Sequence, residues 1–202
     1  MKSKKIAVVM GGPSDEREVS LNTGRAILKA LQTKGYNVIE IDLEPKQFIT
    51  KIVEENVDIV FNAIHGKFGE DGILQGALEL LGIPYTGSGV LASAIAMDKG
   101  VSKRIFVAAG IPTPKSRLYT KDELNAALPT VIEKDFGVPV VIKSAAQGSS
   151  IGVYIVEKPG DLNEAVKQAF KYSDSILVEE FIKGREVTVA VYGSHDPKAL
   201  PI

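Results

Sequence analysis

The feature of this sequence that most restricts its fold is a regular alternation of apolar, strand-like segments with amphipathic, helix-like segments near its start. Runs of β-branched and other apolar residues predict three strands, at residues 6–10, 38–41 and 59–63. Apolar spacing typical of helices predicts three helices, at about residues 15–34, 48–55 and 73–81. Strands that alternate with helices favour a parallel sheet covered on both faces. The first part of the chain is therefore predicted to be an α/β domain.

Polar, glycine-containing segments follow the first and third predicted strands, at residues 11–16 and 65–71. In open parallel sheets ligands bind beyond the carboxyl ends of the strands, so both segments should border one crevice. Asp15 and Glu18 have the spacing of a capping box for the first helix. We expect that helix to turn Val19 and Ile27 toward the sheet.

The stretch from Val140 to Val153 combines a strand, a lysine and a loop of small residues. An apolar strand is predicted at residues 138–142, Lys143 follows it, and a second strand begins at Val153. Serine hydroxyls and the exposed backbone N–H groups of a glycine-containing loop can surround an anion. A lid over phosphates and an ordinary hairpin with a solvated lysine both fit this loop when it is considered alone.

The second half of the chain has a different pattern, with hairpin-like strands and separate helices. Thr120 and Glu123 have capping-box spacing for a helix that Pro129 should kink or restart. Asp161 should cap a helix whose apolar stripe includes Val166. Further strands are expected at residues 176–178 and 186–192. This half is predicted to be α+β, and the change of domain should lie between residues 87 and 114.

Composition excludes several classes of function. The chain has 202 residues, with 24 Lys and Arg against 25 Asp and Glu and a net charge of −1, so nucleic acid and anionic membranes are not expected as partners. It has no cysteine, which excludes disulfides and thiolate chemistry. The apolar run near the N-terminus, about six residues, is too short for a signal peptide, and none approaches the ~20 residues that span a membrane. A cytoplasmic location is expected.

Four segments together resemble the D-alanine–D-alanine ligase family, ATP-grasp enzymes of bacterial cell-wall (peptidoglycan) synthesis. They read G-G-P-S-D-E-R-E-V-S (11–20), I-H-G-K-F-G-E-D-G-I-L-Q-G (64–76), P-Y-T-G-S-G-V-L-A-S-A-I-A-M-D-K (84–99) and Q-G-S-S-I-G-V (147–153). The resemblance covers about the first two thirds of such an enzyme. It implies an α/β N-terminal substrate domain at residues 1–87, an ATP-grasp lid subdomain at 88–178, and the incomplete start of a second ATP-grasp lobe at 179–202.

The resemblance implies an ATP-dependent ligase that phosphorylates one D-alanine and lets the amine of a second attack the acyl phosphate. Glu16 resembles the acid that holds the ammonium group of the first D-alanine, and His65 resembles the histidine near its carboxylate. Val19 falls among the residues implied to bind this substrate. Ser149 resembles the lid serine that hydrogen-bonds toward Glu16. Judged without the resemblance, Glu16 could equally complement a helix dipole, and His65 could be a packed residue.

The nucleotide site is implied by a second set of residues. Lys99 and Lys143 resemble the two ATP-grasp lysines that contact phosphates, although most lysines are simply solvated. The other implied ATP contacts are the lid serines Ser149 and Ser150, the adenine segment Glu179, Glu180, Phe181 and Ile182, and Glu186 at the ribose. No Walker A motif is present, so a P-loop mechanism is excluded. Positioning and charge neutralisation should carry the phosphoryl transfer.

The cofactors implied are ATP and Mg²⁺, with Mn²⁺ as a possible substitute. The family's metal ligands lie beyond the last residue of this sequence, and no carboxylate cluster in it replaces them. We therefore expect this chain alone not to turn over, and to be poorly soluble because of an uncovered sheet edge. Ser144 stands where the family usually has proline, which should loosen the exit of the lid strand.

Three alternatives stay open from the sequence. A ligase that uses D-lactate or D-serine as the second substrate would share all of these motifs. A non-catalytic module that binds a nucleotide or an amino acid is a second alternative, and an α/β interaction domain without a ligand is a third. The partners expected are D-alanine and ATP, with a homodimer formed through the first domain and no nucleic acid or membrane.

Overall fold

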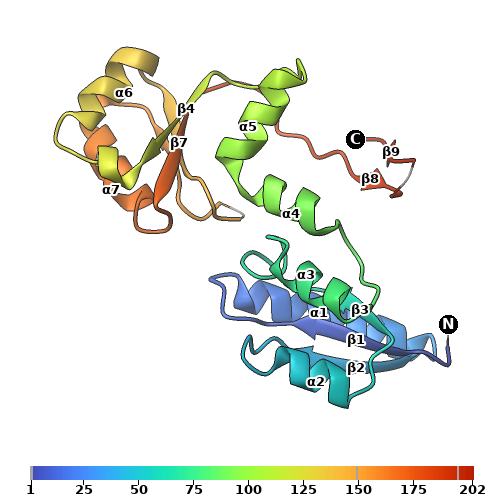
Figure 1. The fold of residues 1–202 in the computed structure, drawn as a ribbon. Coiled ribbons are helices and arrows are strands. Elements are labelled where there is room, and N and C mark those ends of the chain that lie inside the picture. The colour runs from blue at the N-terminus through green and yellow to red at the C-terminus, as the bar shows by residue number, and fades with distance from the viewer. Residues whose placement is uncertain (1, 149, 195) are drawn as a thin grey trace.

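The computed structural model describes residues 2–148, 150–194 and 196–202. Two sheets lie at opposite ends of the molecule, and the helices α4 (Val90–Met97) and α5 (Lys99–Ala108) run between them (Figure 1). The predicted change of architecture along the chain is confirmed, because one sheet is parallel and the other antiparallel.

The first sheet contains β2 (Asn37–Asp42), β1 (Lys5–Met10) and β3 (Ile59–Asn62) in that order, all parallel. The central strand β1 is buried on both faces because its side chains alternate between two clusters. Ala7 and Val9 pack with the side of α2 (Phe48–Glu54) and α3 (Ile73–Leu80), whereas Val8 and Met10 pack with α1 (Arg17–Thr33). The predicted layered α/β domain is therefore confirmed.

At residues 84–86 the chain contacts β3 through a single parallel bridge between Val60 and Tyr85. Two backbone hydrogen bonds support it, from Val60 N to the Pro84 carbonyl and from Thr86 N to the Val60 carbonyl. The chain then turns away into α4, which limits further pairing.

The second sheet has the order β4 (Ser116–Thr120), β7 (Ser175–Glu180), β5 (Val140–Ser144) and β6 (Val153–Val156), and every neighbouring pair is antiparallel. The helices α6 (Leu128–Phe136) and α7 (Leu162–Ala169) share one core cluster with the buried residues of these strands. Hairpin pairing of β5 with β6 confirms the predicted strand–loop–strand at the lid. Near the C-terminus β8 (Val191–Tyr192) pairs with β9 (Lys198–Ala199).

Helix starts were predicted with mixed success. The N-cap of α1 is Glu16, so the capping box of Asp15 with Glu18 is wrong. Ser14 shapes this turn instead, since its hydroxyl donates to the His65 carbonyl at 2.8 Å and accepts from Glu16 N at 3.3 Å. The buried stripe of α1 begins one residue after Val19, which leaves Val19 exposed.

The predicted capping box of Thr120 with Glu123 is present, but it caps the start of the 3-10 turn η1 (Lys121–Glu123) rather than of a long helix. α6 starts separately at Leu128 with Pro129 in its first turn, which confirms the predicted restart. A second 3-10 turn, η2 (Pro159–Asp161), precedes α7.

The strand predicted at residues 186–192 is mostly wrong, because among these residues β8 takes in Val191 and Tyr192 and the preceding ones are exposed and irregular. A segment with an alternating pattern forms a strand when a partner strand pairs with it, and β9 pairs with two of these residues. None of the described helices is long and apolar enough to cross a membrane.

Gly24 allows α1 to pack closely on β1, and this contact can be tested. A Cβ atom at Gly24 would lie 2.5 Å from Met10 Cβ, and Met10 is fully buried. Gly76 in α3 is a matched control, because the nearest atom to its Cβ position is 4.0 Å away. We expect Gly24→Ala to lower the free energy of unfolding by about 1–3 kcal/mol through overpacking. Gly76→Ala should raise it by about 0.5–1 kcal/mol through helix propensity.

Urea unfolding followed by circular dichroism measures both changes. Equal stabilisation by the two substitutions would show that α1 can move away from β1 without cost.

Candidate active site

Three cavities adjoin one another along the junction of α4 and α5. The first, about 440 Å³, is bordered by the end of β3, by α1 and by α4. The second, about 340 Å³, shares Glu70 with the first and Lys99 with the third, which is about 420 Å³. Ala96 lines all three. The three cavities therefore connect the strand ends of the first sheet to β5 and β7 of the second.

Glu16 lies at the start of α1, on a turn that is held by a partly exposed network of hydrogen bonds. Arg17 donates to both carboxylate oxygens of Asp42, at 2.8 and 2.5 Å, and Gly12 N donates to the same carboxylate at 3.3 Å. The hydrogen bond to Arg17 holds the pKa of Asp42 below its usual range. The ends of β1 and β2 are tied together in this way, so the turn presents Glu16 from a rigid base.

The carboxylate of Glu16 lies against two glycines from different parts of the chain. A Cβ atom would approach Glu16 Oε2 to 2.6 Å at Gly66 and to 2.7 Å at Gly148. Gly66 belongs to the segment after β3 and Gly148 to the lid between β5 and β6. The lid therefore reaches the first domain at Glu16, and a larger residue at either glycine would displace this contact.

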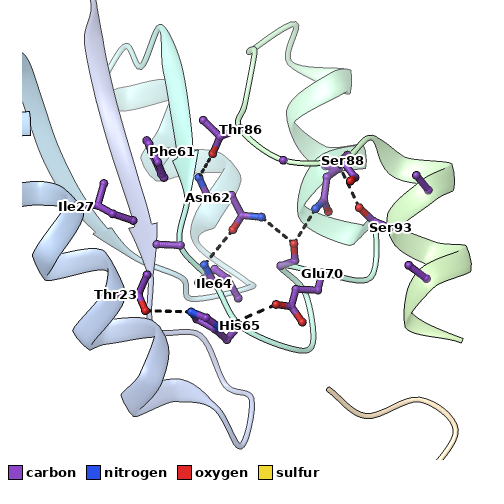
Figure 2. A pocket seen from close by; sticks show the side chains of 16 residues that line it. Thr23, Ile27, Phe61, Asn62, Ile64, His65, Glu70, Thr86, Ser88 and Ser93 are labelled. Carbon is purple, nitrogen blue, oxygen red and sulfur yellow. Dashed lines mark hydrogen bonds and ion pairs between the residues drawn. The ribbon is translucent and has the colours of Figure 1, made fainter. Parts of the chain in front are cut away.

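His65 and Glu70 lie next to each other in the lining of the first cavity (Figure 2). His65 Nε2 lies 3.1 Å from Thr23 Oγ1, and His65 Nδ1 lies 4.0 Å from Glu70 Oε1. Burial raises the pKa of Glu70 above its usual range, and the charge of Glu16 adds to this increase. Sequence reasoning missed Glu70, although it lies in the 64–76 segment five residues after the predicted site histidine.

The loop that carries His65 and Glu70 is anchored by two amides that sequence reasoning also missed. Asn62 Nδ2 and Gln75 Nε2 both donate to the Gly69 carbonyl, at 2.8 and 2.7 Å (Figure 2 shows the bond from Asn62). Gln75 is buried and lines the cavity, and its Oε1 has no hydrogen-bond partner among the described residues. The loop is thus held at its centre by the two amides, and the partnerless Oε1 of Gln75 is buried beneath it.

Lysines gather around one buried acid in the third cavity. Lys143 Nζ lies 2.5 Å from Glu179 Oε2, and Lys103 Nζ lies 2.8 Å from Glu179 Oε1. Burial alone would raise the pKa of Glu179, but the two ammonium groups outweigh it and hold the pKa below its usual range. With Lys99 on the same cavity, three cations face one carboxylate, so the cavity suits an anion.

Lys99 links the helical junction to the lid. Its ammonium group donates to the Gln147 carbonyl, and its backbone N–H donates to the Ala145 carbonyl at 3.1 Å. Burial lowers the pKa of Lys99, and the positive charge of Lys143 lowers it further. The structure therefore brings together Lys99 and Lys143, the two lysines that the sequence singled out.

The remaining residues predicted to bind substrate or ATP lie in more exposed positions or make other contacts. Val19, Ile182 and Glu186 are exposed, and Phe181 is partly buried. Glu180 caps the start of β4 by accepting from Lys115 N at 2.8 Å. Ser150 is exposed in the lid turn, and Ser149 lies outside the described residues.

Ser144 also contributes to the lid hairpin, at the end of β5. Its hydroxyl donates to the Ala169 carbonyl at 2.7 Å, which ties the strand exit to α7. This buried hydrogen bond argues against the expectation that Ser144 loosens the lid.

The described residues do not form a magnesium site. Among them there is no group of three or more His, Asp or Glu side chains that could hold a metal ion.

Two family models match the chain, one described as the D-ala D-ala ligase N-terminus over residues 5–54 and 44–88, and the other as the D-ala D-ala ligase C-terminus over residues 105–202. A D-alanine–D-alanine ligase of Moorella thermoacetica is 50% identical over 98% of this chain and 65% of its own length. The chain thus spans about two thirds of that relative.

Two solved structures are similar at the level of the fold. The D-alanine–D-alanine ligase of Bacillus anthracis complexed with ATP gives a TM-score of 0.78 at 33% identity, over 98% of this chain and 71% of that one. The VanG D-Ala:D-Ser ligase of Enterococcus faecalis gives 0.79 at 33% identity, over 97% and 68%. The predicted class is confirmed, a parallel-sheet domain followed by an ATP-grasp domain. The chain belongs to the D-alanine–D-alanine ligase family. The boundaries at residues 87 and 178 stay predictions.

The raised pKa of Glu70 gives a prediction about pH. When the folded-state pKa of a carboxyl group lies above its unfolded value of ~4.3, the protein loses stability as the pH rises from the unfolded-state pKa to the folded-state pKa. The Glu70 side chain is 45% exposed, so solvent screens much of this effect. Glu70→Gln should therefore raise the melting temperature slightly relative to the parent at pH 7, and have little effect at pH 4. Exposed Glu157→Gln is the control. A shift of equal size at both pH values would contradict this environment for Glu70.

Proposed function

We propose that this chain provides the first-substrate and nucleotide sites of an ATP-dependent ligase that joins two D-alanines for peptidoglycan precursors. The observation that carries the proposal is the contact of the lid with Glu16 on one side and with Lys99 on the other. This arrangement sets a carboxylate suited to an ammonium group beside a cation cluster suited to phosphates. The family membership and the ATP complex of the Bacillus anthracis relative support it.

The first D-alanine would bind near Glu16 and His65. An ammonium group placed at the Glu16 carboxylate would gain a charge-assisted hydrogen bond in a partly enclosed site. His65, oriented by Thr23, would face the carboxylate that reacts. Glu70, with its raised pKa, is a further candidate to hold a proton close to His65.

ATP would occupy the lysine cavity beneath the lid. Lys99 and Lys143 would neutralise its phosphates, with Ser149, Ser150 and the lid backbone adding donors. The adenine would lie along residues 179–182, where the chain leaves β7, and Glu186 would reach the ribose. A carboxylate oxygen of the first D-alanine attacks the γ-phosphorus and ADP leaves. The amine of the second D-alanine then displaces phosphate from the acyl carbon.

Mg²⁺, or Mn²⁺ in its place, would accompany ATP, and the described residues contain no group of three or more His, Asp or Glu side chains that could hold it. The steps assigned to this chain are therefore binding, orientation and charge neutralisation. We propose a cytoplasmic homodimer. An apolar groove of about 260 Å³ between α2 and α3, lined by Phe48, Ile49 and Ile73 among others, would suit contact between copies.

A ligase that uses D-serine as its second substrate is the alternative that a specific observation supports, namely the similarity to the Enterococcus faecalis enzyme. The TM-scores to the two kinds of ligase are nearly equal, so the shared part of the fold does not distinguish them. The 50% identity to a D-alanine–D-alanine ligase favours D-alanine. A D-lactate acceptor and a purely binding role stay as further alternatives.

Calorimetric titration with D-alanine, and separately with ATP and Mg²⁺, tests the proposal. We expect Glu16→Ala to weaken D-alanine binding at least tenfold, because the ammonium group loses its charged partner at a cost of more than about 1.4 kcal/mol. Glu18→Ala is the matched control, since Glu18 lies on the same helix turn and is exposed.

ATP binding should be unaffected by Glu16→Ala and weakened by Lys143→Met. D-alanine binding that survives Glu16→Ala unchanged would refute the assignment of the substrate site.

A further inference from the structure

Lys103 is a buried lysine that the proposed binding steps do not use. It lies on α5 with 8% of its surface exposed. Its ammonium group contacts Glu179 Oε1 at 2.8 Å, and donates to Thr113 Oγ1 at 2.7 Å and to the Pro114 carbonyl at 2.6 Å. A lysine has three donors, so this one is fully satisfied. Full burial with full pairing is unusual for lysine and indicates a fixed position.

Lys143 contacts the same carboxylate, but its side chain is more exposed than that of Lys103. It meets the other oxygen, Glu179 Oε2, at 2.5 Å, and its side chain is 31% exposed. It lines the cavity together with Lys99, and it is located at the end of a strand beside the lid. Lys143 can therefore turn from Glu179 toward a ligand in the cavity, whereas Lys103 is held on three sides.

This difference between the two lysines matters because Glu179 must keep a positive partner. Glu179 is 5% exposed, and a buried carboxylate left without a cation is strongly unfavourable. If Lys143 were its sole cation, moving Lys143 to a phosphate would strand that negative charge. With Lys103 in place, Glu179 stays paired when Lys143 moves.

We propose that Lys103 is a positioning residue, the permanent counter-ion of Glu179 that leaves Lys143 free to exchange this carboxylate for a nucleotide phosphate. The inference rests on the proposed nucleotide site and assigns a role within it. Lys103 also joins β7 to the connector at Thr113 and Pro114, so it fixes one wall of the cavity that Lys143 faces.

The first arm of the test needs no ligand. The 202-residue chain is compared with Lys103→Met and Lys143→Met, and with Arg104→Met as an exposed cation on the same helix. We expect Lys103→Met to lower the melting temperature by roughly 6 °C or more, because a buried charge loses its fixed partner. Lys143→Met and Arg104→Met should each lower it by less than about 2 °C. Equal losses for the two buried-pair variants would overturn the assignment.

Lys103→Gln is included because it keeps hydrogen-bond donors for Thr113 and Pro114 but removes the charge. A melting temperature for this variant close to that of the parent would also overturn the proposal, since the charge would then be dispensable. Failure of both Lys103 variants to fold, with Lys143→Met folded, would be the extreme form of the expected asymmetry.

The second arm separates a positioning role from a merely structural one. ATP and adenosine are titrated into the parent and into Lys103→Gln. We expect ATP affinity to fall about tenfold and adenosine affinity to stay within about twofold, because the loss acts through Lys143 on the phosphates. Equal weakening of both ligands would show a structural role and overturn the proposal. If the parent binds no ATP, the proposed function fails, while the melting temperatures still decide which lysine is the counter-ion.

Discussion

The buried carboxylate of Glu179 is the interaction on which the geometry of the second half depends. It joins α5, β5 and β7, because its two oxygens are held by Lys103 and Lys143 from separate elements. Burying an ion is costly unless opposite charges and hydrogen bonds compensate it. Any displacement of α5 from β7 would break that compensation. The helix that bears Lys99 is therefore placed by electrostatics more than by apolar packing, and its buried residues are indeed Gly100 and Lys103.

A second constraint is steric, and it decides where the two halves of the molecule meet. Gly66 and Gly148 come from segments more than 80 residues apart, yet both lie against the carboxylate of Glu16. A side chain at either position would push the Glu16 carboxylate aside, because Glu16 Oε2 is the atom nearest to both Cβ positions. Small residues thus let one carboxylate and one ammonium group approach the same loop from opposite sides.

Much of the fold could be predicted because burial makes apolar residues recur at regular spacings along strands and helices. The side chains of β1 alternate between two cores, which requires a continuous apolar run, and that run was visible in the sequence. The hairpin of β5 and β6 was likewise predicted from its apolar strands and small residues. Glu70 and Lys103 were missed because their roles depend on neighbours distant in sequence. Residues 186–192 were misassigned because an alternating pattern gives no information on whether a partner strand is present.

Sequence also could not rank the three lysines of the cavity, since each is simply a cation near a strand or at the start of a helix. Burial and pairing separate them: Lys103 is enclosed by three acceptors, Lys143 shares one carboxylate, and Lys99 bonds to the lid. One negative charge against three positive ones leaves the cavity attractive to phosphates even before any lysine moves. Because Lys103 is already satisfied, that surplus charge resides on Lys99 and Lys143, the two cations closest to the lid. The position of the fixed lysine thus determines where an anion would be held.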